Sequence, residues 1–396
     1  MTTDPSKDPI VIVGSARTPM GGFQGELSGL TASQLGAHAI KAALTRANVA
    51  ADQVEEVIMG CVLPAGQGQA PARQASRGAG IPDSTGATTV NKMCGSGMQA
   101  AMFAHDMLIA GTNKVMVAGG MESMTNAPYL LDKARGGYRM GHGRVMDHMF
   151  LDGLEDAYDK GRLMGTFAED CAQAYQFSRE AQDNFALASL DRARKAANLA
   201  AEIAPLTIST RKGETVLAED EQPRKALPDK IPTLKPAFRD GGTVTAANSS
   251  SISDGGAALV MMKLSEAEKR GLTPLAAIRG HSTFAQAPNL FTTAPVFAMR
   301  NLLAKLNWQA GAVDLYEINE AFAVVTMAAM RDLDLPHDKV NVHGGACALG
   351  HPIGASGARI LVTLLSALQK YDLKKGVASL CIGGGEATAL AVERLT

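Results

Sequence analysis

Val90-Asn91-Lys92-Met93-Cys94-Gly95-Ser96-Gly97-Met98-Gln99-Ala100 joins a short β-like run, residues 88–90, to an apolar segment of helical character, residues 98–110. Cys94 is therefore expected at a strand-to-helix corner, where the flanking glycines let other atoms approach its backbone closely. The free N–H groups and the dipole of a helix N-terminus stabilise a thiolate, so this position predicts a lowered pKa and a nucleophilic cysteine. Most cysteines are buried and inert. The prediction therefore requires a base, an oxyanion site and a binding surface elsewhere in the chain.

The composition is that of a globular protein without a strongly charged face. At 396 residues the chain exceeds one ordinary hydrophobic core, so two or three domains or subdomains are expected. Hydrophobic residues make up 46% and charged residues 19%, which is typical of a soluble protein, and the formal net charge of −1 argues against a broad nucleic-acid or anionic membrane surface. Residues 1–9 are polar and lack the apolar core of a secretory signal, and no apolar run has the length of a transmembrane helix.

The cysteines and histidines follow no metal-binding spacing. The five cysteines are Cys61, Cys94, Cys171, Cys347 and Cys381. None forms a C-x-x-C pair and no histidine belongs to an H-E-x-x-H motif, so no metal centre is predicted. An odd number of unclustered cysteines without a signal sequence indicates free thiols in a reducing compartment, and the cytoplasm is the expected location.

Short apolar runs alternate with helical segments in the first and last thirds of the chain. Buried strands are expected at residues 10–14, 54–62, 115–120, 256–262, 276–279 and 313–318, with a closing strand at 377–382. Helices are expected from an N-cap at Thr31 to about residue 46, at 296–306, from about 320, and at 355–371. This alternation predicts an α/β layered fold, and neither an all-β protein nor a helical bundle.

The middle third differs, and the two flanking thirds resemble each other. From about residue 125 to 251 the chain is richer in charge, methionine and turn residues, residues 167–196 have amphipathic helical periodicity, and we interpret the section as an insertion. Cys94-Gly95-Ser96-Gly97 opens a helix that leads to a buried strand and Glu122, and Gly354-Ala355-Ser356-Gly357 opens one that leads to a buried strand and Glu386. This repetition predicts a duplicated α/β unit related by a pseudo-dyad.

Three further motifs lie in the C-terminal half. The first, which follows a strand, is Asn319-Glu320-Ala321-Phe322-Ala323. The second is a glycine-dense turn before a helix, Gly350-His351-Pro352-Ile353-Gly354. The third ends a buried strand with three glycines that have no side chains, Cys381-Ile382-Gly383-Gly384-Gly385-Glu386. Glycines at such a strand end can present N–H groups to a developing oxyanion. Taken singly, the three motifs also fit a helix N-cap, a structural histidine and a buried cysteine before an ordinary turn.

Two other functional classes match the sequence less well. Residues 95–100 formally match the dinucleotide fingerprint G-x-G-x-x-A, but they lie far from the N-terminal strand and next to a cysteine. Cysteine, histidine and asparagine also occur together in cysteine proteases, but the order here is Cys94, Asn319, His351 and the local papain-type sequence is absent.

The Cys94 stretch and the three C-terminal motifs, in this order and spacing, resemble the thiolase family over essentially the whole chain. The same resemblance holds for the segment Gly242-Thr243-Val244-Thr245-Ala246-Ala247-Asn248-Ser249-Ser250. Within the family, the similarity points to the bacterial acetyl-CoA acetyltransferases. The resemblance implies a duplicated α/β/α/β/α layered fold with an inserted loop domain. The halves would be residues 1–123, joined by 252–273, and residues 274–396, with the loop domain at 124–251 over the coenzyme A site.

The resemblance also implies catalytic roles. Cys94 would take the acyl group as a thioester, His351 would deprotonate it, and Cys381 would move the second proton. One oxyanion site would consist of His351 and a water held by Asn319, and the other of the N–H groups of Cys94 and Gly383.

Substrate contacts follow from the same resemblance. The positions that match coenzyme A contacts are Leu154, Met164, Arg224, Ala246 and Ser250, with Phe238 and Phe322 lining the pocket. Two positions depart from the family pattern: Leu163 stands where many relatives have histidine, and Ser251 replaces a usual glycine. Both departures bear on acyl-chain preference and on the coenzyme A contacts.

The function expected from the resemblance is reversible condensation of two acetyl-CoA to acetoacetyl-CoA and CoA. Coenzyme A and its thioesters would be substrates, with no permanently bound cofactor and no metal, and the protein would assemble as a homotetramer or a dimer. The alternatives are a broad-range 3-ketoacyl-CoA thiolase of β-oxidation, a decarboxylating ketoacyl synthase and a non-catalytic acyl-CoA or lipid-binding paralogue. Ketoacyl synthases generally pair cysteine with two histidines or with histidine and asparagine, so Cys381 favours a thiolase.

Overall fold

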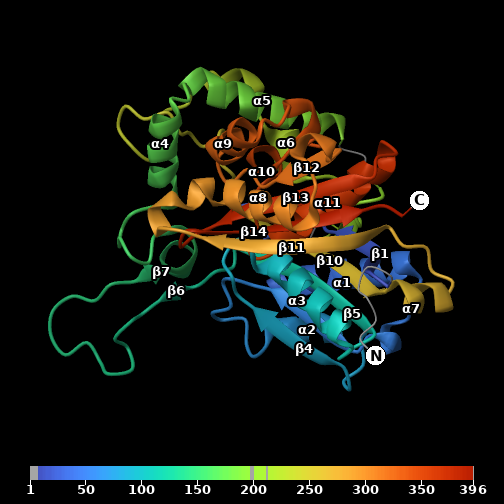
Figure 1. Ribbon diagram of the computed structural model, residues 1–396. Helices are drawn as coiled ribbons and strands as arrows, with labels where there is room; N and C mark the ends of the chain where they lie inside the picture. The colour runs from blue at the N-terminus through green and yellow to red at the C-terminus, as the bar shows by residue number, and fades with distance from the viewer. Residues whose placement is uncertain (1–7, 197–199, 211–212, 396) are drawn as a thin grey trace.

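The computed structural model describes residues 8–196, 200–210 and 213–395, so most of the polar stretch at residues 1–9 lies outside it. A ten-stranded sheet runs through the molecule (Figure 1). Its strands lie in the order β12 (Leu315–Ile318), β13 (Lys375–Ile382), β14 (Glu386–Glu393), β11 (Ala276–Ala285), β1 (Ile10–Arg17), β10 (Ser253–Lys263), β5 (Val115–Ser123), β3 (Glu56–Gly60) and β4 (Gly86–Val90), and β2 (Gly21–Gly22) pairs with β10.

The sheet repeats one pattern on both sides of the β1–β11 junction. In the first half, β10 is antiparallel to β1 and β5, and β5 is parallel to β3. In the second half, β14 is antiparallel to β11 and β13, and β13 is parallel to β12. The two halves meet where Val11 and Ile12 of β1 pair with Ala277 and Ala276 of β11. The duplicated α/β architecture predicted from the repeated motifs is therefore confirmed.

The helices form layers on and between the two halves of the sheet. Outer helices α1 (Ala32–Ala47) and α2 (Pro71–Gly78) cover the first half, and α8 (Ala294–Leu306) and α9 (Ala323–Leu333) cover the second. Helices α3 (Ser96–Ala110) and α11 (Ser356–Lys370) lie in the central core with side chains from both halves. In β5, Met116 and Ala118 join that central core whereas Val115 and Val117 pack on the outer side, as the alternation of a strand requires.

Two glycines permit the closest contact between the central helices. A Cβ atom at Gly97 would lie 2.7 Å from the backbone nitrogen of Ala358, and one at Gly357 would lie 2.3 Å from that of Met98. Both distances are far below van der Waals contact, so only glycine fits where the first turns of α3 and α11 cross. Because Cys94 precedes α3 and His351 precedes α11, this crossing brings their loops together.

The middle third of the chain leaves the sheet after β5 and returns to it as β10, the strand next to β5. Its elements are β6 (Tyr129–Leu130), β7 (Met146–Asp147), η2 (Phe150–Leu154), α4 (Met164–Tyr175), α5 (Arg179–Lys195), β8 (Leu206–Thr210), β9 (Gly213–Leu217), α6 (Glu221–Lys225) and η3 (Pro228–Thr233). Between β6 and β7 the chain extends away from the body as a long arm (Figure 1). The division at residues 123/124 and 251/252 stays a prediction.

Short elements complete the chain: η1 (Ala51–Gln53), α7 (Leu264–Lys269), η4 (Pro288–Thr293), η5 (Ala310–Ala312), η6 (His337–Lys339) and α10 (Ala346–Leu349). Among the described residues, no helix combines the length and apolar character that a membrane crossing requires.

Two sequence-based boundaries were wrong, and one periodic segment is divided between two helices. The helical periodicity of residues 167–196 belongs to two helices, because Gln176 adopts a left-handed conformation and Ser178 caps a new helix at the Ala181 N–H. The helix expected from residue 320 begins at Ala323, because the Glu320 carboxylate accepts hydrogen bonds from other segments instead. Strand β13 is followed by β14 and is not the closing strand.

The crossing of the central helices gives a direct stability prediction. Gly357→Ala should destabilise the fold by roughly 1–3 kcal/mol, the usual cost of overpacking a dense core, because the obstacle is the backbone of Met98. Gly311→Ala is the matched control, since Gly311 is exposed and has no atom within 4 Å of an added Cβ. Denaturant titration of both variants measures the difference, and equal stabilities would contradict the prediction.

Candidate active site

A tight turn holds Cys94 between β4 and α3. The Asn91 side chain accepts a hydrogen bond from the Met93 N–H at 2.9 Å, and Met93 adopts a left-handed backbone with φ of 47°. The hydroxyl of Ser96 accepts from the Lys92 N–H at 2.8 Å and donates to the Met93 carbonyl at 2.6 Å. These bonds fix the turn, and the strand-to-helix corner predicted for Cys94 is confirmed.

The thiol of Cys94 faces backbone N–H groups in an otherwise desolvated place. Burial raises the pKa of Cys94 to about 11, although hydrogen bonds from the N–H groups of Gly383 and Cys94 itself act in the opposite direction. The prediction of a lowered Cys94 pKa from the helix N-terminus was therefore wrong. Desolvation outweighs these two hydrogen bonds, so the thiol needs a base to take its proton. The two N–H groups are those that the sequence suggested for an oxyanion site.

Cys381 lies at the end of β13, close to Cys94. A Cβ at Gly95 would lie 2.4 Å from Cδ1 of Ile382, so the two cysteine-bearing loops are in close contact. Burial, followed by the neighbouring Cys94, raises the pKa of Cys381 well above its ordinary value. The structure thus brings together two protonated thiols, one from each half of the molecule.

His351 is held as a neutral base with one free nitrogen. The Ser356 hydroxyl lies 2.5 Å from Nδ1 of His351 and donates its proton to the carbonyl of Pro352 at 3.0 Å. A hydroxyl has one proton, so we assign the Nδ1–H tautomer to His351. Its buried Nε2 has no hydrogen-bond partner. Burial, followed by the charge of Arg359, lowers the pKa of His351 to about 3, which leaves a lone pair on Nε2 at neutral pH.

Asn319 follows β12 and is oriented by a buried arginine. Its Oδ1 accepts a hydrogen bond from Nη2 of Arg359 at 3.3 Å, and its Nδ2 lies 3.5 Å from Nδ1 of His351. Arg359 is fully buried on α11 and lies 3.7 Å from the carboxylate of Glu317. The asparagine amide is thus held beside His351 by a charge that the sequence analysis did not single out.

Glu122 is a second residue whose role the sequence analysis missed. Its buried carboxylate accepts hydrogen bonds from the N–H groups of Val62, Leu63 and Gly354 at 2.9–3.1 Å. Gly354 belongs to the turn that carries His351, so Glu122 ties this turn to the first half of the sheet. Burial raises the pKa of Glu122 to about 7. The signal available in the sequence was the repeat itself, in which Glu122 and Glu386 occupy equivalent positions.

Lys92 and Glu386 form an ion pair between the two cysteine loops. Lys92 lies two residues before Cys94, and Glu386 follows the glycines that begin at Gly383. The pair links the two halves of the molecule at the site, because each partner belongs to a different repeat.

Four of the predicted substrate residues share apolar clusters with the two cysteines. Met164, Phe238 and Phe322 share an apolar cluster with Cys381, and Leu154 packs in another cluster with Cys94. The rings of Phe238 and Phe322 meet edge to face at 5.9 Å. Both thiols therefore belong to apolar clusters that include predicted substrate residues.

The other predicted contacts lie further out. Ala246 lines a cavity of about 350 Å³ together with Ser251, Lys225 and Lys230. Arg224, next to Lys225 on α6, is engaged with the carboxylate of Glu26 at 2.6 Å.

The remaining positions are held by backbone bonds. The Ser250 N–H donates to the carbonyl of Ala321 at 2.9 Å. Of the two departures from the family pattern, Ser251 accepts the His351 N–H through its carbonyl at 3.1 Å, and Leu163 is the residue before α4.

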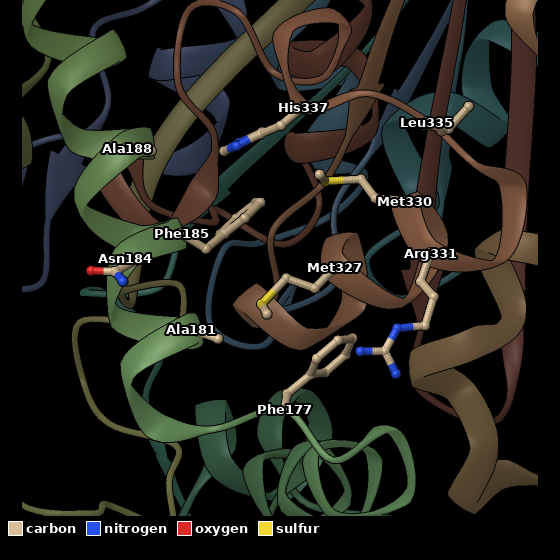
Figure 2. A pocket seen from close by; sticks show the side chains of 10 residues that line it. All are labelled: Phe177, Ala181, Asn184, Phe185, Ala188, Met327, Met330, Arg331, Leu335 and His337. Atoms are coloured by element: carbon tan, nitrogen blue, oxygen red, sulfur yellow. The ribbon is translucent and has the colours of Figure 1, made fainter.

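A separate apolar groove lies between α5 and α9 (Figure 2). Its volume is about 470 Å³, and Phe177, Phe185, Met327 and Met330 line it together with Arg331. None of the predicted catalytic or substrate residues lines this groove.

Comparison with known protein families identifies the class of protein that has this fold and site. Residues 10–265 match the model of the thiolase N-terminal domain, and residues 272–394 match that of the thiolase C-terminal domain. The chain belongs to the thiolase family.

Particular relatives match over nearly full length. Acetyl-CoA acetyltransferase 2 of Arabidopsis thaliana is 51% identical over 98% of this chain and 97% of its own. The acetyl-CoA acetyltransferase of Cupriavidus necator is 49% identical over 97% and 99%.

Solved structures agree with the fold. The acetyl-CoA acetyltransferase of Syntrophomonas wolfei superposes with a TM-score of 0.94 at 38% identity, covering 98% of this chain and 99% of that one. The Acat5 thiolase of Ascaris suum, solved in complex with coenzyme A, gives a TM-score of 0.92 at 39% identity, covering 98% and 100%.

The protonation states of the site predict how Cys94 alkylation depends on pH. Iodoacetamide reacts with the thiolate, and a pKa of about 11 means that the thiolate fraction rises with pH up to that value. In His351→Asn, which lacks the base, the rate should rise about tenfold per pH unit between pH 7 and 10. The wild type should react faster near pH 7 and depend less on pH, because neutral His351 can accept the proton.

Mass spectrometry of the Cys94 peptide measures these rates, with the partly buried Cys347 as an internal reference. A plateau near neutral pH in His351→Asn would mean that the thiol is already ionised without the histidine, against the prediction.

Proposed function

We propose that this chain is an acetyl-CoA C-acetyltransferase that interconverts two acetyl-CoA with acetoacetyl-CoA and CoA. The observation that carries the proposal is the pair of neighbouring buried thiols, Cys94 and Cys381, together with neutral His351 in the turn before α11, whose first turn crosses that of α3. A Claisen condensation of thioesters needs one nucleophile to hold an acyl group and one base to remove a carbon-bound proton. The relatives named acetyl-CoA acetyltransferase support this assignment.

The first step is acyl transfer to Cys94. Nε2 of His351 takes the thiol proton while the sulfur attacks the carbonyl carbon of acetyl-CoA. The carbonyl oxygen becomes negatively charged and is stabilised by preorganised donors. The carbon–sulfur bond to CoA then breaks, and CoA leaves as a thiol with the proton from His351. The free Nε2 and the hydrogen bond of Nδ1 to Ser356 support this role.

The second step forms the carbon–carbon bond. Cys381 first gives its thiol proton to His351, and the Cys381 thiolate then removes a methyl proton from a second acetyl-CoA. The resulting carbanion attacks the acetyl carbonyl held on Cys94. The bond to the Cys94 sulfur breaks, acetoacetyl-CoA leaves, and the Cys94 thiolate takes the proton from His351. The N–H groups of Cys94 and Gly383 lie at the Cys94 sulfur and are therefore suited to bind the oxygen of its thioester. The Asn319 amide, held beside His351 by Arg359, is suited to hold a water for the other oxyanion.

Coenzyme A would reach these thiols along the inserted segment. The acyl end would be surrounded by Leu154, Met164, Phe238 and Phe322, since these residues share apolar clusters with the cysteines. Ala246, Ser250 and Arg224 would contact the pantetheine arm and the nucleotide. The lysines at the cavity of Ala246 suit a phosphorylated nucleotide. The mechanism uses CoA thioesters as substrates and needs no permanently bound cofactor.

The acyl-enzyme is the direct test of the proposal. Incubation with acetyl-CoA should add one acetyl group to Cys94, and Cys94→Ser should lose activity by orders of magnitude because a hydroxyl ionises far less readily than a thiol. Cys381→Ser is the matched variant: it should still be acetylated but should not condense two acetyl-CoA. Peptide mass spectrometry and a thiolysis assay with acetoacetyl-CoA and CoA measure both effects. A protein that forms no adduct and shows no thiolysis would rule the proposal out.

The same assay separates the alternatives. A broad-range 3-ketoacyl-CoA thiolase would retain its kcat/KM as the acyl chain lengthens, whereas the proposed enzyme should favour acetoacetyl-CoA. A non-catalytic acyl-CoA-binding paralogue would bind the thioester without turnover.

We further propose a cytoplasmic homotetramer. The cytoplasmic location is supported by the five cysteines, all of which are free. Strand β4 ends the sheet, and within the described residues no strand covers its outer edge, so a second copy can extend the sheet there. The arm between β6 and β7 exposes apolar side chains, including Leu131 (54%), Met140 (95%) and Val145 (65%), which suits contact between two such dimers.

Removal of the arm tests this assembly. Replacing residues 132–144 by a short Gly-Ser linker should convert the tetramer into a dimer, because it removes the proposed contact between dimers. The arm lies outside the folded body, so the fold itself should be unaffected. Light scattering after gel filtration gives both masses. A wild type that is not tetrameric, or an armless variant of unchanged assembly, would contradict the proposal.

A further inference from the structure

Two histidines and a carboxylate meet on the surface where α3 passes β11. Oδ1 of Asp106 lies 2.9 Å from Nδ1 of His105 and 2.9 Å from Nε2 of His281. The two imidazole rings stand nearly perpendicular, with centroids 5.1 Å apart. The three donor atoms all lie within 4.8 Å of one another. The cluster is not used by the proposed reaction.

The fold holds the two imidazoles and leaves the carboxylate free to move. The side chains of His105 and His281 are each 16% exposed, whereas that of Asp106 is 59% exposed. His105 and Asp106 are consecutive residues of a helix, whose side chains do not ordinarily face each other. They converge on His281, which comes from the other half of the molecule. The cluster is therefore open to solvent on the side of Asp106.

A positive group lies beside the cluster. The ammonium of Lys305 is 3.4 Å from the His281 carbonyl. Its charge opposes the binding of any cation, so the candidate ligand set depends on coordination by the two imidazoles and the carboxylate.

We propose that His105, Asp106 and His281 form a site for a divalent transition-metal ion such as Zn²⁺. Two imidazole nitrogens and one carboxylate oxygen are a common zinc ligand set, with water completing the tetrahedron. Bonds of this kind place neighbouring donor atoms about 3.3 Å apart. The present spacing of 2.9 Å around Asp106 requires a small outward movement of an exposed side chain. A bound ion would link α3 of the first half to β11 of the second.

The test measures ion binding to the full chain in a Cys94→Ser background, which removes the reactive thiol as a competing ligand. Calorimetry should find one Zn²⁺ per chain, and His281→Gln should weaken binding at least tenfold while the metal-free protein keeps its unfolding temperature. Zn²⁺ should raise the unfolding temperature of the Cys94→Ser protein and not of the variant that also carries His281→Gln. His142→Gln is the control, since His142 is an exposed histidine outside the cluster.

Co²⁺ absorption identifies the ligands. A site of nitrogen and oxygen donors should give visible d–d bands without a thiolate-to-metal band in the near ultraviolet. Absence of ion uptake, uptake unaffected by His281→Gln, or a thiolate band would each overturn the proposal. These readouts do not depend on acyl transfer, so they are independent of the proposed function.

Discussion

The backbone contact between the first turns of α3 and α11 is the constraint on which the rest of the structure depends. Gly97 and Gly357 leave no space for a Cβ, so the two helices cross at backbone distance. Each helix is preceded by the turn that carries a reactive group, Cys94 in one half and His351 in the other. The helices also lie in the central core shared by both halves of the sheet. One steric condition therefore fixes both the layer spacing and the approach of the nucleophile to the base.

Buried charges hold the site around that contact. Glu122 gathers three backbone N–H groups from two segments, one of which leads to His351. Arg359 orients Asn319, and its charge contributes to the lowered pKa of His351. A buried charge is costly unless it is paired and hydrogen-bonded, so these residues are fixed in place and can fix others. Desolvation also keeps the Cys94 thiol and the His351 imidazole neutral. The proposed acylation therefore depends on proton transfer between these two groups and does not start from a thiolate.

Much of the fold was predictable because apolar periodicity and glycine spacing report burial directly. The strands at residues 115–120 and 256–262 were correctly predicted, as was the helix capped by Thr31, where the capping box confirms the local reasoning. Errors arose where distant segments act on a local pattern. Glu320 is used by groups more than 20 residues away, so its helix begins later than the sequence suggests. The sign of the Cys94 pKa shift was wrong for the same reason, since desolvation is a property of the packed site.

The sequence by itself determined the duplicated α/β architecture, the thiolase family and the two cysteine-bearing turns, because each is recorded in short motifs, in their order and in the apolar pattern along the chain. Only the tertiary structure decided which groups face each other across the halves. Arg359 beside Asn319 and His281 beside Asp106 are juxtapositions with no local signal, and the absence of metal-binding spacing in the sequence does not bear on donors brought together from α3 and β11. The physical reason is that local pattern records which side of an element is buried. The partner on that side, and with it the charge state of the site, is set by packing between distant segments.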